Sequence, residues 1–151
     1  MALKETISAE LKEAMKARDQ VRLDTLRSAL SAFSYRKIEA GCELDDADQV
    51  EVVRKLVKQR TDSIAEFERG NRPELAAKES RERDILSALL PAQKSSDDIR
   101  PLVRAALEAL PPEQRNVGAA MKAVMPRLRA EADGATIRQA VQEELRALPS
   151  A

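Results

Sequence analysis

The sequence has no histidine and no tryptophan, and it has one cysteine, four glycines, two phenylalanines and one tyrosine. Histidine is the commonest general base and a leading ligand of transition metals, so its absence disfavours both kinds of site. The single Cys42 excludes an intramolecular disulfide. So few aromatic side chains do not suffice to stack a run of unpaired bases. Recognition of single-stranded nucleic acid by base stacking is therefore not expected.

Motifs of several other site classes are also missing. The sequence has no glycine-rich phosphate motif and no GxSxG turn that would present a nucleophilic serine. No apolar run approaches the ~20 residues that cross a membrane. Lys4, Glu5 and Glu10 interrupt any apolar segment that a secretion signal would need. From these absences we expect a cytoplasmic protein with no cofactor, no metal site, no catalytic residues and no membrane partner.

The composition that is present favours helices. The chain has 151 residues, of which 43% are hydrophobic and 34% charged, and Leu, Ala, Glu, Lys and Arg dominate. All five residue types favour the α-helix. Positive and negative residues balance to a formal net charge of +0. A protein that coats polyanions without selectivity would be basic, so we do not expect one here. We predict an all-α fold of one domain or two small lobes.

Apolar residues spaced three or four apart predict an N-terminal lobe, residues 1–92, of about four helices. The first two helices are marked by Leu3 to Met15 and by Leu23 to Phe33. Asp45 and Asp48 predict an acidic capping box at the start of the third helix. The same acidic cluster could attract Mg²⁺, but capping explains it sufficiently.

The third and fourth helices form a predicted αα-hairpin that is central to this lobe. Gly70 and Pro73 mark the turn, because glycine ends helices and proline suits a first helical turn. Arg60 falls in the apolar stripe of the first helix of the hairpin, and Glu79 and Glu82 fall in that of the second. We expect Arg60 to pair with Glu79 or Glu82 inside the seam; the alternative is that Arg60 serves a ligand.

Residues 93–151 predict a C-terminal lobe of three short helices, which begins after the Leu89-Leu90-Pro91 boundary. Ser95 or Ser96, Asn116 and Asp133 are the expected N-caps of the three helices. Basic residues gather on the last two of these helices and on the turns around them. Backbone N–H groups near Gly134, at the start of the last helix, could assist in binding an anion.

Three long segments together resemble the YqeY family: LKEAMKARDQVRLDTLRSAL, VKQRTDSIAEFERGNRPELAAKESRERDILSALLP and VGAAMKAVMPRLRAEADGATIRQAVQEEL. The family is similar to the C-terminal tail domain of the B subunit of the glutamine-dependent aspartyl/glutamyl-tRNA amidotransferase. The resemblance covers nearly the whole chain and implies a helical N-terminal lobe and a three-helix C-terminal lobe. It also implies an association with tRNA, without the catalytic parts of the amidotransferase.

Three functions follow as hypotheses from this resemblance. The first is a non-catalytic accessory module that binds tRNA or a tRNA-bound complex by shape and charge. Its candidate contacts are Lys122, Arg127, Arg129, Arg138 and the backbone at Gly134. The second is a protein-interaction adaptor for an aminoacyl-tRNA synthetase or an amidotransferase, without direct RNA contact. The third, which we favour least, is carbon–nitrogen ligase activity with glutamine as amido donor, as part of a complex.

Overall fold

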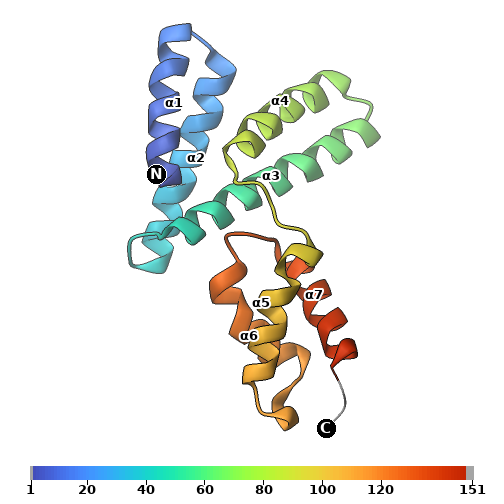
Figure 1. Cartoon of the computed structure of the whole chain (residues 1–151). Coiled ribbons are helices and arrows are strands. Elements are labelled where there is room, and N and C mark those ends of the chain that lie inside the picture. The colour runs from blue at the N-terminus through green and yellow to red at the C-terminus, as the bar shows by residue number, and fades with distance from the viewer. Residues whose placement is uncertain (1, 149–151) are drawn as a thin grey trace. The chain divides into compact units, whose positions relative to one another are not determined.

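The computed structural model describes residues 2–148, which form seven α-helices, one 3-10 helix and no strand (Figure 1). The predicted all-α fold is confirmed. The chain divides between Pro91 and Ala92 into two compact units, each with its own hydrophobic core. Along the described residues, no helix combines the length and the apolar character that crossing a membrane requires.

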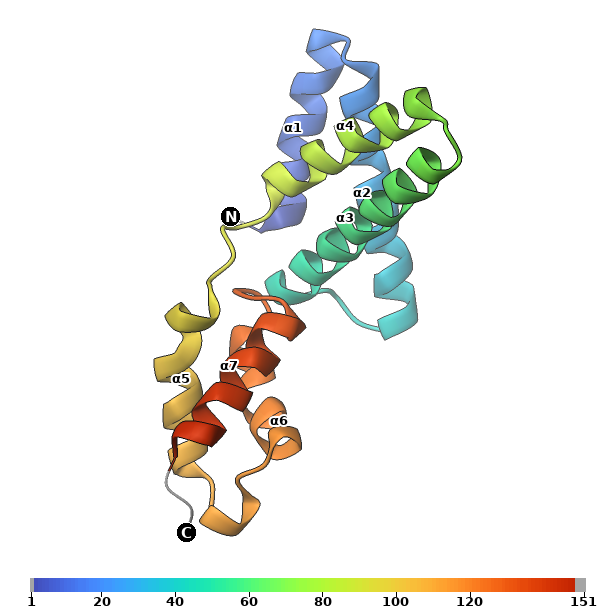
Figure 2. The same ribbon diagram turned by 90° about the vertical axis from the view of Figure 1, so that its right-hand side faces the viewer.

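The N-terminal unit consists of two antiparallel helix pairs. The first pair is α1 (Leu3–Ala17) with α2 (Gln20–Ala40), and the second is the hairpin of α3 (Asp46–Arg69) with α4 (Pro73–Leu89) (Figure 2). Its core takes residues from all four helices, as the spacing of apolar residues in each helix requires. The buried members are Ile7, Ala14, Leu26, Ala29, Phe33, Val53, Leu86 and Leu89.

Local side-chain contacts fix where these helices begin. The capping box at α3 is confirmed: the Asp45 carboxylate accepts from the Asp48 N–H at 2.7 Å, and the Asp48 carboxylate accepts from the Asp45 N–H. Each helix start has unpaired N–H groups, and these carboxylates satisfy two of them. Metal binding is not needed to explain this acidic cluster.

The hairpin turn differs in one detail from the expected glycine stop. Gly70 has φ −79°, and the left-handed residue is Asn71, with φ 54°. The Arg72 N–H donates to the Phe67 carbonyl at 2.8 Å and the Asn71 N–H to the Glu68 carbonyl. This is a Schellman ending, in which asparagine takes the position more often held by glycine. Pro73 begins α4, as expected.

The C-terminal unit is a bundle of α5 (Ser96–Ala109), α6 (Val117–Leu128) and α7 (Gly134–Ala147), with the short 3-10 helix η1 (Pro112–Gln114) between α5 and α6. Ser95, Asn116 and Asp133 cap the three helices, and in each case the side-chain oxygen accepts a backbone N–H three residues later. The buried core is Ile99, Val103, Leu107, Ala120, Val124, Leu128, Ala132, Ile137, Ala140 and Val141.

Candidate functional site

The basic residues predicted to bind RNA lie on α6, on α7 and on the turn between them. Lys122 and Arg127 are exposed on α6, and Arg138 is exposed on α7. Within residues 2–148 none of the three side chains forms an ion pair. Lys122 and Arg127 are five residues apart, so they project about 140° from one another around the helix axis. Their positive charges are therefore separate and do not form one cluster.

The other two candidates are less available. Arg129 is the C-cap of α6, is half-buried and is not free of intramolecular contacts. Gly134 is the first residue of α7, and there the Asp133 carboxylate accepts the Thr136 N–H at 2.7 Å. This carboxylate already occupies the positive end of the helix dipole and would repel a phosphate group. The structure therefore weakens the case for Arg129 and Gly134.

Arg115 lies in the same basic region but has an internal role. Its Nε donates to the carbonyls of Leu107 and Leu110 at 3.0 and 3.1 Å, and one Nη donates to the carbonyl of Glu108. These carbonyls lie at the C-terminal end of α5, whose last turn contains no basic residue. Arg115 supplies both the donors and the positive charge that a helix end needs.

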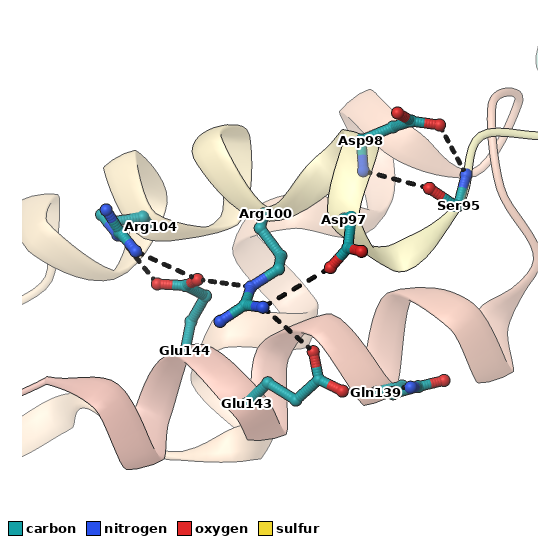
Figure 3. A network of polar contacts seen from close by, with 8 residues as sticks. All are labelled: Ser95, Asp97, Asp98, Arg100, Arg104, Gln139, Glu143 and Glu144. Carbon is teal, nitrogen blue, oxygen red and sulfur yellow. Dashed lines mark hydrogen bonds and ion pairs between the residues drawn. The ribbon is translucent and has the colours of Figure 1, made fainter.

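A polar network joins α5 to α7 through Glu144 (Figure 3). Glu144 is fully buried on α7. Arg100 Nε donates to Glu144 Oε1 and Arg104 Nε to Glu144 Oε2, each at 2.9 Å. Arg100 also lies 3.5 Å from Asp97 and 3.7 Å from Glu143. Both oxygens of the buried carboxylate thus receive charge-assisted hydrogen bonds, as a buried charge requires.

The network shifts the ionisation of its members. The Arg104 hydrogen bond, assisted by that of Arg100, holds the pKa of Glu144 below its ordinary value, although burial acts in the opposite direction. Reciprocally, the hydrogen bond with Glu144 raises the pKa of Arg100 and of Arg104. Glu144 therefore stays charged at neutral pH and is not poised to exchange a proton.

Sequence reasoning missed Glu144, although the sequence contained a signal for it. Glu144 lies three residues after Val141 and seven after Ile137, on the apolar stripe of α7. A charged residue on such a stripe indicates a buried partner, and α5 supplies two arginines four residues apart. The same reasoning identified Arg60 in the other unit.

The structure brings Arg60 close to both predicted partners. Arg60 Nε lies 3.4 Å from Glu82 Oε2 and 3.9 Å from Glu79 Oε2, and one Nη donates to Ser28 Oγ at 3.4 Å. The side chains of Arg60, Glu79 and Glu82 are 17%, 22% and 16% exposed. Nε itself makes no hydrogen bond, so the contact is an ion pair and not the bidentate contact that a guanidinium allows. Arg60 links α3 to α4 and to α2.

Comparison with known proteins places this arrangement in a family. The model of the family described as Yqey-like protein matches residues 4–145. The match covers all seven helices apart from the first residue of α1 and the last two residues of α7.

The chain is also similar to proteins named altered inheritance of mitochondria protein 41, mitochondrial. It is 37% identical over 99 residues to the protein from Kluyveromyces lactis, covering 62% of this chain and 54% of the relative. It is 36% identical over 107 residues to the protein from Saccharomyces cerevisiae strain YJM789, covering 69% of this chain and 58% of the relative. The chain spans about half the length of the curated relatives it matches.

The names of these relatives overturn the cytoplasmic location expected from the sequence. The relatives are named as mitochondrial proteins, so the prediction of a cytoplasmic location is wrong by this comparison. The prediction rested in part on the lone Cys42. A single cysteine excludes an intramolecular disulfide in any compartment, and so it does not distinguish the cytoplasm from a mitochondrion.

Proposed function

Because the chain belongs to the YqeY family, we propose that it is a non-catalytic helical accessory module whose target is tRNA or a tRNA-bound complex. The proposal draws on the resemblance of the family to the tail domain of the tRNA amidotransferase B subunit. The mitochondrial name of the relatives supports a mitochondrial place of action.

One observation carries the proposal: the difference between paired and unpaired cations in the C-terminal unit. Lys94, Arg100 and Arg104 form ion pairs with carboxylates of their own unit. Lys122, Arg127 and Arg138 are exposed and have no such partner among the described residues. An exposed cation without an internal partner is available to a phosphate group at no cost in intramolecular contacts. These three side chains can therefore contact phosphate groups without breaking an ion pair of their own unit.

The test is a titration of the purified chain with tRNA at several salt concentrations. Each phosphate contact contributes about −0.7 to −0.9 to the slope of log K against log salt. The combined variant K122A, R127A and R138A should weaken binding and make this slope less steep by about 2 to 3. The substituted side chains are exposed, so the fold should be retained.

The matched control removes the same residue types from the N-terminal unit. Lys12, Arg27 and Arg81 are exposed, and among the described residues they form no ion pair. The variant K12A, R27A and R81A therefore changes the net charge equally and should bind tRNA like the parent. If both triple variants lose affinity to the same extent, the binding is non-specific attraction. If neither loses affinity, the proposed surface is wrong.

A protein-interaction adaptor without RNA contact is the second candidate, because large apolar side chains are exposed on the N-terminal unit. A partner synthetase or amidotransferase that co-purifies after nuclease treatment would favour it. Carbon–nitrogen ligase activity with glutamine as amido donor is the third candidate, within a complex. Glutamine-dependent amidation of aminoacyl-tRNA by the purified chain alone would contradict the non-catalytic proposal.

A further inference from the structure

The last two turns of α2 contribute no residue to the buried core of the N-terminal unit. Phe33 is the last buried residue of α2, and every residue from 34 to 40 is exposed. The antiparallel α1 has 15 residues against 21 in α2, and α2 continues past the beginning of α1 (Figures 1 and 2). These turns carry Tyr35 and Ile38, which are 76% and 78% exposed and are the most exposed large hydrophobic side chains of the described chain.

Tyr35 and Ile38 form a ridge along this segment. They are three residues apart, so they lie on one helix face, about 60° from each other and roughly opposite to the buried Phe33. We call these two side chains the Tyr35–Ile38 ridge. An apolar pair of this kind that faces water has no role in the core of its own unit, and contiguous exposed apolar surface marks interaction sites.

A hollow lies on each side of this segment of α2, and apolar and charged side chains line both hollows. The hollow beside Ile38 has a volume of about 310 Å³, and Phe33 and Leu44 line it. The hollow beside Tyr35 has a volume of about 450 Å³, and Val52 and Leu56 line it. The hollow beside Tyr35 lies next to the ridge and is lined by residues of α2 and α3, whereas the hollow beside Ile38 extends around α2 toward Phe33.

Charges around the ridge select the partner. Glu39 and Glu43 are already engaged, in ion pairs with Arg36 and Lys37. Lys4 lines the hollow beside Ile38 and Lys55 lines the hollow beside Tyr35, and both are exposed. Within residues 2–148 neither ammonium group forms an ion pair. In the hollow beside Ile38, Lys4 acts on the Glu43 carboxylate, which also pairs with Lys37, so the hollow beside Tyr35 is the one that combines apolar side chains with a cation, Lys55, outside any ion pair of the described residues.

We propose that the Tyr35–Ile38 ridge docks an amphipathic helix of a partner protein that carries carboxylates beside its apolar stripe. Apolar side chains of this helix cover the ridge and enter the hollow beside Tyr35, and carboxylates on that side of the helix meet Lys55. An anionic membrane fits less well, because a flat bilayer leaves the hollows unfilled and meets Glu39 and Glu43. This surface belongs to the N-terminal unit, so the proposal is independent of tRNA binding by α6 and α7.

The test uses two fluorescein-labelled synthetic helices of about 18 residues with the same leucine stripe. One carries glutamate on both sides of the stripe, and its twin carries lysine there. Binding to the full chain is measured by fluorescence anisotropy. The glutamate peptide should bind, and the lysine peptide should bind about tenfold more weakly or not at all. Y35S combined with I38S should weaken binding of the glutamate peptide by about tenfold or more.

Two further variants keep this test decisive. M15S removes another exposed apolar side chain, 55% exposed on α1, and should bind the glutamate peptide like the parent. K55E should reduce the difference in affinity between the glutamate peptide and the lysine peptide. The proposal is overturned if the glutamate peptide does not bind, if both peptides bind equally, or if the ridge variant binds like the parent.

Two other occupants of the ridge are separate outcomes that would also overturn the proposal. Sedimentation equilibrium of the parent and of the ridge variant detects a second copy of this chain as the occupant. Phosphatidylserine vesicles, co-sedimented with the same two proteins, detect a lipid surface. Because none of these measurements contains RNA, a negative result leaves the proposed tRNA surface to its own titration.

Discussion

At the scale of single residues, Glu144 carries the most deeply buried charge among the described residues of the C-terminal unit. The carboxylate has no exposed surface, whereas the side chains of Arg100 and Arg104 are 36% and 55% exposed. Loss of the arginines leaves a charge without partners inside the unit. Loss of the carboxylate leaves two cations that can turn to water. The network should therefore tolerate change at Glu144 better than the combined loss of Arg100 and Arg104.

This asymmetry gives a prediction for acid stability. The folded-state pKa of Glu144 lies below its ordinary value of 4.5, so the charged network stabilises the fold above about that pH and this contribution is lost as the pH falls further. E144Q should lower the free energy of unfolding by about 1–2 kcal/mol at pH 7. The difference from the parent should shrink between pH 5 and pH 3, as measured by urea unfolding at each pH.

E113Q is the matched control for this prediction, because Glu113 is an exposed carboxylate of the same unit. Its unfolding curve should follow that of the parent at every pH. A difference between E144Q and the parent that stays constant down to pH 3 would show that hydrogen-bond geometry matters and that the charge of Glu144 does not. R100A combined with R104A should cost about 3 kcal/mol, which is more than E144Q.

At the scale of elements, the sequence predicted the helices well because their signals are local. Caps such as Asp45 and Asp133 bond to N–H groups three residues away, and apolar spacing marks the buried face of each helix. The overhang of α2 could not be predicted in this way. The apolar stripe from Leu23 to Phe33 predicts which side of α2 is buried. The residue at which α1 stops covering α2 depends on the length and register of α1, which this stripe does not contain.

The α3–α4 hairpin provides the prediction at this scale. R60A should lower the free energy of unfolding by about 2 kcal/mol, because it leaves Glu79 and Glu82, neighbours on one face of α4, without the cation they share. We expect a smaller loss of stability than for a fully buried pair, because all three side chains keep some contact with water. The measurement is a double-mutant cycle of R60A with E82A in urea, and the coupling free energy should be about 1 kcal/mol.

The exposed pair of Lys58 and Asp62 on the same helix serves as the reference for this cycle. These side chains are 76% and 64% exposed and lie 3.0 Å apart. K58A should change stability by less than about 0.5 kcal/mol. If R60A has an equally small effect, the contact of Arg60 with the two glutamates does not stabilise the hairpin, and a role for Arg60 in ligand binding becomes the better explanation.

At the scale of the whole molecule, the two hydrophobic cores share no residue. Each unit should therefore respond to substitutions in its own core network. In hydrogen exchange followed by mass spectrometry, R60A should raise exchange in α3 and α4 and leave α5 and α7 unchanged. E144Q should raise exchange in α5 and α7 and leave exchange in α3 and α4 unchanged. Equal effects of either variant in both units would mean that the chain unfolds as one cooperative body.

The Glu144 network also has an evolutionary consequence. Loss of both arginines would leave the buried carboxylate without a partner. An apolar residue at position 144 would leave the two guanidinium groups beside an apolar surface. The three sites should therefore change as a set across descendants of a common ancestor. Lineages with leucine or alanine at 144 are expected to have exchanged Arg100 and Arg104 for uncharged side chains as well, so that covariation records this contact.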